Sequence, residues 1–274
     1  MRDRNRPRVL QQVAGRVRFE HGSPDSVGTP ERAAIVVHWG SSARLSRSFT
    51  TLVNEFAAAD YLPVVVSACE VEEPLEWNGK RPAQALVIRK PNIGYDFGSW
   101  AVGLHELPTL AHAPHVVLAN DSLVGPFSTI RPLLQRFENS RADVFGLTDT
   151  RQFRHHLQSY FLGFSGGILA HAPLRAFFDN IRREPTKWDI IRNSELGLAD
   201  LLRREAYVST AAFRADEVVE AGQNPVIKGW WKLLEQGYPF VKREIVRNPA
   251  VAPRSEWVRR EVLAVFDENV DEWM

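Results

Sequence analysis

The sequence contains few of the features that mark disulfide-bonded, zinc-binding or membrane-spanning proteins. Its single cysteine, Cys69, leaves no partner for an internal disulfide and no ligand set for a structural zinc site. Cys69 lies in the apolar run "LPVVVSACE", so we expect a small core residue. No segment approaches the roughly 20 apolar residues of a membrane span, and the N-terminus lacks the apolar core of a secretory signal. The sequence therefore predicts a cytoplasmic protein.

Several motifs that identify enzyme classes are also absent. The chain has no Gly-Lys-Ser/Thr phosphate loop and no Gly-x-Gly-x-x-Gly fingerprint, which disfavours NTPases and nicotinamide-dependent enzymes. Serine hydrolases are also disfavoured, because the stretch that matches Gly-x-Ser-x-Gly, "GFSGG", sits in an apolar strand rather than at a strand-to-helix elbow. In "FSGGILA" the glycines directly follow Ser165, and a bend in an apolar strand explains them better than a nucleophile.

Charge is balanced over the whole chain but uneven along it. The formal net charge of +1 over 274 residues indicates no general affinity for nucleic acid. The first eighteen residues hold six arginines and one aspartate, and a turn-rich segment follows them. This composition predicts a flexible basic arm over residues 1–30. The arm is either a solvated terminus or a contact with anionic lipid headgroups, to which each nearby arginine adds about 1 kcal/mol.

From residue 31 the sequence alternates between short β-branched runs and longer helical patterns. Strands are expected at the following ranges: 33–40, 62–70, 85–90, 115–121 and 142–149. Helices are expected at 46–61, 99–111 and 128–140, the first and last capped by Ser46 and Ser128. This alternation predicts one α/β domain with a mostly parallel sheet between two layers of helices. We place it at residues 31–250, followed by a helical C-terminal extension at 251–274.

Polar residues collect where the expected strands end. Ligands of open parallel sheets bind beyond the carboxyl ends of the strands. Each of these residues alone is an ordinary turn former, but together they favour a donor-binding site. The candidates are His38, Asn92, Gly94, Asp96, Asn120, Asp121, Ser122 and Asp149.

The stretch "LANDS" has the chemistry of a site for a hard cation. A carboxylate at Asp121, flanked by the Asn120 amide and the Ser122 hydroxyl, suits Mg²⁺ or Mn²⁺ that is itself bound to diphosphate oxygens. Nearby, Gly94 permits close approach of a ligand to the backbone, and Asp96 would accept hydrogen bonds from ribose or sugar hydroxyls.

Six motifs together resemble the rhamnan synthesis F family of bacterial polysaccharide glycosyltransferases. They occur in the family's order and span about residue 33 to 250: "NIGYDFGSW", "LANDSLVGPF", "GLTDT", "HLQSYFLGF", "SELGLADLL" and "NPVIKGWWKLLEQGYPFVKREIV". The resemblance implies a glycosyltransferase A-type fold, in which a nucleotide-diphosphate sugar lies across the strand ends of a Rossmann-like sheet. It also implies a metal-binding Asp-x-Asp-like motif, of which "ANDS" retains only Asp121.

The resemblance also implies roles for later residues. Related inverting enzymes carry an acidic general base at the start of a later helix, and "NSELGL" places Glu195 there, where the helix dipole favours a carboxylate. The alternative for Glu195 is a first-turn capping role. On the acceptor side, His156 and Gln158 would bind hydroxyls and Tyr160 would stack on a sugar. Trp230 and Lys242 would close over the acceptor or a phosphate, although paired tryptophans more often pack in a core.

These assignments predict transfer of a sugar from a nucleotide-diphosphate donor to a hydroxyl of a cell-surface polysaccharide or lipid-linked oligosaccharide. The family name suggests L-rhamnose as the sugar. A lipid-linked acceptor would place the protein at the inner face of the cell membrane. Two alternatives remain: a non-catalytic nucleotide-sugar or carbohydrate-binding protein of the same fold, and a sugar nucleotidyltransferase.

Overall fold

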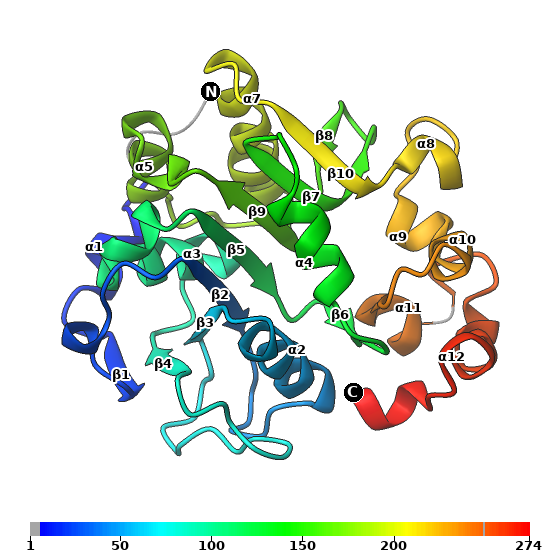
Figure 1. The fold of residues 1–274 in the computed structure, drawn as a ribbon, viewed down its shortest axis with the longest axis horizontal. Helices are drawn as coiled ribbons and strands as arrows, with labels where there is room; N and C mark the ends of the chain where they lie inside the picture. The colour runs from blue at the N-terminus through cyan, green and yellow to red at the C-terminus, as the bar shows by residue number, and fades with distance from the viewer. Residues whose placement is uncertain (1–5, 249) are drawn as a thin grey trace.

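A nine-stranded sheet runs through the described part of the chain, which comprises residues 6–248 and 250–274 of a computed structural model (Figure 1). Its ninth strand, β8 (His156–Leu157), pairs with β7 at one end of the sheet. The other strands follow the order β1 (Arg18–His21), β4 (Leu86–Arg89), β3 (Leu62–Ser67), β2 (Arg32–His38), β5 (His115–Asn120), β9 (Phe161–Ser165), β7 (Val144–Thr150) and β10 (Ser209–Phe213).

The sheet is mostly parallel, which confirms the predicted fold class. Strands β4, β3, β2 and β5 are parallel neighbours, as are β7 and β10, whereas β1 and β9 run antiparallel to the strands beside them. In the central register Val37 lies opposite both Val66 and Asn120. The carboxyl ends of β2, β3 and β5 therefore meet at one edge of a Rossmann-like sheet.

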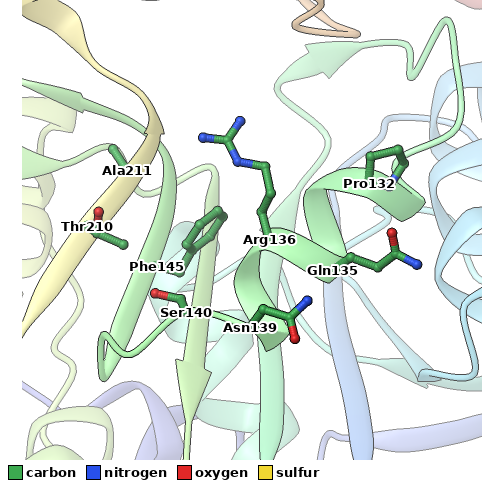
Figure 2. Close-up of a pocket in the computed structure, with 8 residues that line it drawn as sticks. All are labelled: Pro132, Gln135, Arg136, Asn139, Ser140, Phe145, Thr210 and Ala211. Carbon is green, nitrogen blue, oxygen red and sulfur yellow. The ribbon is translucent and has the colours of Figure 1, made fainter.

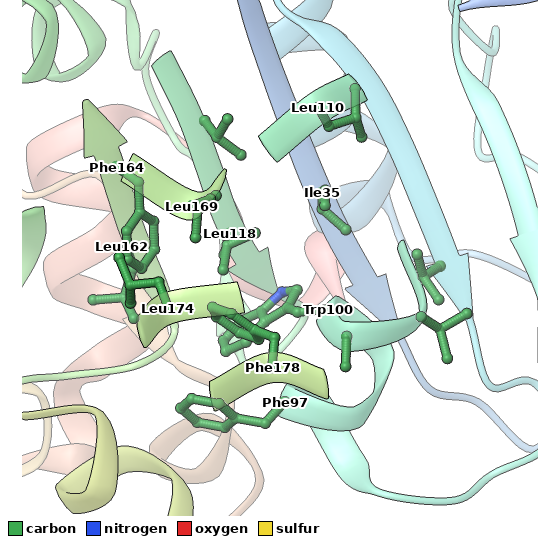
Figure 3. Close-up of a cluster of buried hydrophobic side chains, with 14 of the residues drawn as sticks. Ile35, Phe97, Trp100, Leu110, Leu118, Leu162, Phe164, Leu169, Leu174 and Phe178 are labelled. Atoms are coloured by element: carbon green, nitrogen blue, oxygen red, sulfur yellow. The ribbon is translucent and has the colours of Figure 1, made fainter. Parts of the chain in front are cut away.

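Helices cover both faces of the sheet. One face packs against α1 (Val9–Val13), α3 (Tyr95–Glu106), α5 (Ala172–Asp179) and α7 (Leu196–Arg204), and the other against α2 (Arg47–Ala58) and α4 (Arg131–Glu138). Along β2, Ile35 belongs to the first core and Val36 to the second, so alternate residues are buried on opposite faces. Burial on both faces explains why the sequence of this strand is continuously apolar. In Figure 3 Trp100 lies among the side chains of the first core, and its indole nitrogen donates to the Ala119 carbonyl at 3.1 Å.

Two predicted helix caps have different outcomes. Ser46 caps α2 as expected, because its hydroxyl accepts a hydrogen bond from the backbone of Phe49 at 3.2 Å. The prediction for Ser128 is wrong, since α4 begins at Arg131. A carboxylate oxygen of Glu55 accepts from the backbone N–H of Ile130 at 2.9 Å, so a neighbouring helix supplies the acceptor that Ser128 was expected to provide.

The C-terminal part forms a third core beside the sheet. A two-stranded ribbon, β6 (Leu123–Val124) with β11 (Val241–Lys242), joins it to the end of β5. Its buried members include Trp230, Val241 and Val262. The remaining helices are α6 (Lys187–Ile190), α8 (Ala215–Val218), α9 (Pro225–Lys228), α10 (Trp230–Glu235), α11 (Arg243–Arg247) and α12 (Val258–Phe266).

Residues 6–30 do not form the flexible arm that their composition predicts. Val9 is completely buried, and β1 pairs with the edge strand β4. A Cβ on Gly94 would lie 2.5 Å from a methyl group of Val9, so the glycine admits the start of the chain rather than only a ligand. The arginines of this segment line the outside of a packed structure, and residues 1–5 lie outside the described residues. No helix among the described residues is long and apolar enough to cross a membrane.

Candidate functional site

A cavity of about 1040 Å³ opens at the carboxyl edge of the sheet. The ends of β2, β5 and β7, the segment before β9, the start of α3, the segment before α7 and the ribbon strand β11 surround it. It gathers most of the residues predicted from the sequence, namely His38, Asn92, Gly94, Asp96, Asn120, Asp121, Ser122, His156, Gln158, Tyr160, Glu195 and Lys242.

Two predicted site residues lie elsewhere. One Asp149 oxygen accepts from the backbone of Ala215 at 2.7 Å and the other meets the His155 ring at 2.8 Å, so this carboxylate fastens the loops after β7 and β10. Trp230 is 1% exposed in the third core, where its indole donates to the Pro253 carbonyl at 2.9 Å. The assignments of Asp149 to donor binding and of Trp230 to acceptor binding are corrected to structural roles, because neither side chain faces the cavity.

The strand end "ANDS" forms part of a buried chain of hydrogen bonds. The Lys242 ammonium donates to the Ser122 hydroxyl at 2.8 Å, and that hydroxyl donates to the Asn120 amide oxygen at 2.6 Å. The Asn120 amide nitrogen then donates to Asp96 at 2.7 Å. These bonds fix which way the Asn120 amide points, and they place a lysine and a carboxylate at the two ends of one chain.

Asp96 and Asp121 are two carboxylates that line the cavity. Burial, and next the charge of Asp121, raises the pKa of Asp96 to about 6. Burial also raises the pKa of Asp121, although its Oδ2 accepts from the Trp39 backbone at 3.1 Å and the Arg243 charge lies near it. Hydrogen bonds and nearby cations therefore only partly offset the cost of burying the two carboxylates.

The residues at Asp121 fit a resident divalent cation poorly. Among residues 6–248 and 250–274 no group of three or more His, Cys, Asp or Glu side chains is placed to hold a metal ion. Asp96 and Asp121 each already accept a hydrogen bond, and the cations Lys242 and Arg243 lie against the same strand end. These nearby positive charges oppose the binding of a divalent cation. A metal at Asp121 stays a prediction, and no catalytic step proposed below depends on one.

Glu195 is held by two neighbours at the cavity wall. His156 Nε2 lies 2.9 Å from one carboxylate oxygen, and the Ser159 hydroxyl donates to the other. His156 Nδ1 lies 2.8 Å from the Arg154 carbonyl, which can only accept, so Nδ1 carries a proton. A further proton must then lie between Nε2 and Glu195 for that contact to be a hydrogen bond. The pair thus shares one proton beside the cavity.

The backbone around Glu195 differs from the prediction. Glu195 does not start a helix, because α6, a π-turn at Ile191–Glu195 and α7 form one continuous helical segment that Thr186 caps. Neither the helix dipole nor a first-turn cap therefore explains this carboxylate. A π-turn re-aims side chains along a helix and is frequent at functional sites. Here the turn carries Glu195 at its last position.

Tyr160 is placed differently from the predicted stacking platform. It is 4% exposed, and the Lys242 ammonium lies 5.4 Å from its ring centroid. Thr148 hydrogen-bonds both the Tyr160 hydroxyl and the Gln158 amide oxygen, so these two side chains, in the segment before β9, point the same way, as their spacing of two predicts. Tyr160 therefore supports the cavity floor, and its ring face is already covered.

Sequence reasoning missed three exposed aromatic residues on the cavity rim. Trp39, Tyr95 and Phe153 are 53%, 54% and 58% exposed, and all three line the cavity. Large aromatic side chains beside polar strand ends in "HWG" and "GYDF" were the available signal. Such rings offer stacking surfaces to sugars or bases at the entrance.

A second cavity of about 520 Å³ lies between α4 and the strands β7 and β10 (Figure 2). It adjoins the amino-terminal half of β7, near Phe145, and Arg136 beside it donates to the Ala212 carbonyl at 2.7 Å. None of the predicted site residues lines this cavity, and its lining contains no carboxylate. The polar strand-end cavity is therefore the stronger candidate for chemistry.

His38 gives a pH-dependent contribution to stability that can be measured. Burial, followed by the charges of Arg89 and Arg243, lowers its pKa from 6.5 to about 4. Because the unfolded chain then binds more protons between these values, this contribution to stability is complete above pH 6.5 and is lost as pH falls towards 4. The free energy of unfolding that is lost over this pH range corresponds to about 3 kcal/mol.

The comparison uses His38→Gln, which keeps a partner for the Ser67 hydroxyl that His38 contacts at 3.0 Å. We expect the stability advantage of the wild type over this variant to shrink as pH falls through that window. Asp96, whose pKa is raised, has the opposite effect in both proteins, so urea unfolding is compared as a difference between them. A difference that does not change with pH would contradict a buried, neutral His38.

The fold and the site together define a Rossmann-like α/β protein with a polar cavity at the carboxyl ends of its strands. Comparison with known proteins identifies the family: the sequence model of Rhamnan synthesis protein F matches residues 64–272. The chain therefore belongs to this family, as the six motifs predict. Membership connects it with polysaccharide synthesis by glycosyltransferase-like proteins.

Two relatives show how far individual similarity extends. Virulence protein VirA of Vibrio anguillarum is 27% identical over 217 residues, which cover 67% of this chain and 70% of that protein. The uncharacterized protein y4gN of Sinorhizobium fredii is 28% identical over 155 residues, which cover 55% of this chain and 40% of that protein.

Proposed function

We propose that the protein transfers a sugar from a nucleotide-diphosphate donor to a hydroxyl of a glycan, with Glu195 as general base. The observation that carries the proposal is that Glu195, held by His156 and Ser159, shares one cavity with the strand end that holds Asp121. Within a family of polysaccharide synthesis, that arrangement supports a glycosyltransferase A-type site with a donor floor and an opposing base.

The proposed reaction is a single displacement. The acceptor oxygen forms a bond to the anomeric carbon while the bond from that carbon to the diphosphate breaks. The diphosphate leaves with the bonding electron pair, and the acceptor proton passes to Glu195. When the shared proton lies on His156, Glu195 is ionised and can accept the proton of the acceptor hydroxyl. Ser159 orients the carboxylate. The configuration of the anomeric carbon is thereby inverted.

The donor floor and the acceptor side are assigned to different parts of the cavity. We place the nucleotide diphosphate near the strand ends and the acceptor near His156 and Gln158, in the cavity that the exposed Phe153 also lines. The family description, which names rhamnan synthesis, supports L-rhamnose as the sugar. As the acceptor we propose a cell-surface polysaccharide or a lipid-linked oligosaccharide.

Purified protein incubated with a panel of nucleotide sugars, with and without a lipid-linked acceptor, tests the function. We expect nucleoside diphosphate to be released only when a matching donor and acceptor are both present. Release of pyrophosphate would instead identify a sugar nucleotidyltransferase. Binding of a nucleotide sugar without release of a product under any condition would identify a non-catalytic binding protein. Of the two alternatives, the incomplete acidic motif in "ANDS" favours this one over a nucleotidyltransferase.

A lipid-linked acceptor also implies contact with the inner face of the membrane. Arg8 and Arg16 are exposed on the packed N-terminal segment. We expect replacement of both by glutamine to weaken sedimentation with anionic liposomes, because each loses about 1 kcal/mol of attraction to lipid headgroups. Replacement of the exposed Arg131 and Arg141 is the matched control. Equal losses in the two double variants would show that the N-terminal segment has no special role.

A further inference from the structure

We propose that Lys242, supported by Arg243, binds the donor diphosphate in the place where the motif comparison expects a divalent cation. This inference rests on the proposed function and assigns the charge partner of its donor. The sequence prediction assigned Lys242 to the acceptor or a phosphate and placed a metal at Asp121, so the inference chooses the phosphate for Lys242 and replaces the metal.

The fold brings Lys242 to the donor floor through backbone pairing. Strands β6 and β11 are antiparallel, with Lys242 opposite Leu123. The backbone N–H of Arg243 then donates to the Ser122 carbonyl at 3.0 Å. Two motifs that are far apart in the sequence, "LANDSLVGPF" and "FVKREIV", therefore form one wall of the cavity. Main-chain pairing therefore fixes the backbone of Lys242 beside Ser122, and the Ser122 hydroxyl holds the ammonium group.

The ammonium group of Lys242 lacks a carboxylate partner. Among residues 6–248 and 250–274 its direct polar contact is the Ser122 hydroxyl at 2.8 Å, and no ion pair joins it to an acid. An ammonium has three N–H donors, so two remain for a ligand. Burial lowers the pKa of Lys242, while the charges of Asp96 and Glu195 act in the opposite direction. A partly buried cation with free donors at a cavity wall is suited to an anionic ligand.

Arg243 supplies a second positive charge on the same wall. Its Nε donates to the Asp121 carbonyl at 3.1 Å, and the guanidinium charge lies near the Asp121 carboxylate. Together the two cations match the two negative charges of a diphosphate that is esterified at both ends. A divalent ion at Asp121 would have to bind against both of them, and Asp121 Oδ2 already accepts the Trp39 N–H. The protein's own cations thus neutralise the leaving group.

Calorimetric titration of wild-type protein with dTDP, UDP and inorganic pyrophosphate tests this inference. Each titration is performed in EDTA and again with Mn²⁺. We expect binding of at least one nucleoside diphosphate in EDTA and little change when Mn²⁺ is added. Lys242→Met should weaken that binding by about 10- to 100-fold, the range for one charged hydrogen bond. Lys242→Arg keeps the charge and should recover most of the affinity.

Lys232→Met is the matched control, because Lys232 is exposed on α10 and does not line the cavity. The melting temperature separates ligand binding from a structural role. Removing a partly buried, unpaired charge should leave the ligand-free protein as stable as the wild type or more stable, while the stabilisation caused by the diphosphate is lost.

The outcomes distinguish this inference from the proposed function. Binding that requires Mn²⁺ and is unaffected by Lys242→Met would overturn the inference and leave the donor site intact. Binding of no diphosphate by the wild type under either condition would overturn both. Metal-independent binding that Lys242→Met weakens supports the inference, even if no sugar transfer is detected with any donor.

Discussion

Glu195→Gln should lower the rate of sugar transfer by about 10²–10⁴-fold, the usual effect of removing a general base. The amide has the same shape as the carboxylate and still accepts from Ser159, while its N–H can donate to His156 Nε2 in place of the shared proton. The geometry of the wall is therefore retained and only the ability to accept a proton is lost. The measurement is nucleoside diphosphate release with the matching donor and acceptor.

The matched control is Glu244→Gln, which removes a carboxylate that lines the same cavity and is exposed on α11. It should retain transfer, since it has no contact with His156 or Ser159. Calorimetry should show that Glu195→Gln still binds nucleoside diphosphate as tightly as the wild type. Full transfer activity in Glu195→Gln would remove Glu195 from the mechanism and make its contacts structural.

The parts of the fold that local sequence determines were predictable. A strand buried on both faces needs an unbroken apolar run, and "AAIVVH" has one. The motif "NIGYDFGSW" begins a helix directly after β4, and "LANDS" ends a strand, so their polar residues meet at one edge once the strands are parallel. This logic placed most of the predicted polar residues at one cavity without any knowledge of long-range contacts.

Features that depend on distant partners were not predictable in the same way. Lys242 reaches Ser122 only because β11 pairs with β6, and a two-residue ribbon leaves almost no periodic signal. The π-turn before α7 looks like a helix start in the sequence, because Asn193 and Ser194 are common N-cap residues and would place Glu195 in the first turn. Tyr160, which was expected to stack on a sugar, is buried, whereas Phe153, for which the sequence made no prediction, is exposed, since tertiary packing decides which ring faces solvent.

The N-terminal segment shows how composition can mislead. Six arginines among eighteen residues indicate a solvated tail. However, Val9 inserts beside Gly94 and Gly98, where a Cβ on either glycine would crowd its methyl groups. The glycines of "NIGYDFG" therefore accommodate the packing of the chain's own start, and the helix α3 that lines the cavity rests on it. The burial of Val9 and Val13 outweighs the surrounding charge, because arginines such as Arg8 and Arg16 remain exposed to water while the backbone packs.

Trp230→Ala should destabilise the protein by about 3–5 kcal/mol, the usual cost of truncating a fully buried tryptophan. Trp230 packs in the third core, which also contains Val124 of β6 and Val241 of β11. Truncation leaves a cavity beside that ribbon and removes the partner of the Pro253 carbonyl. Chemical unfolding of the purified variant measures the loss of stability.

Trp230→Phe distinguishes this structural role from the acceptor-binding role that the sequence suggested. It keeps most of the buried volume, so its stability loss should be smaller than that of the alanine variant, and its KM for acceptor should match the wild type. Normal stability with a raised acceptor KM would restore the binding role. Because the third core carries the ribbon that positions Lys242, we further expect Trp230→Ala to weaken diphosphate binding under conditions where the variant is still folded. The packing of Trp230 would then help to set the position of the Lys242 ammonium group through the ribbon formed by β6 and β11.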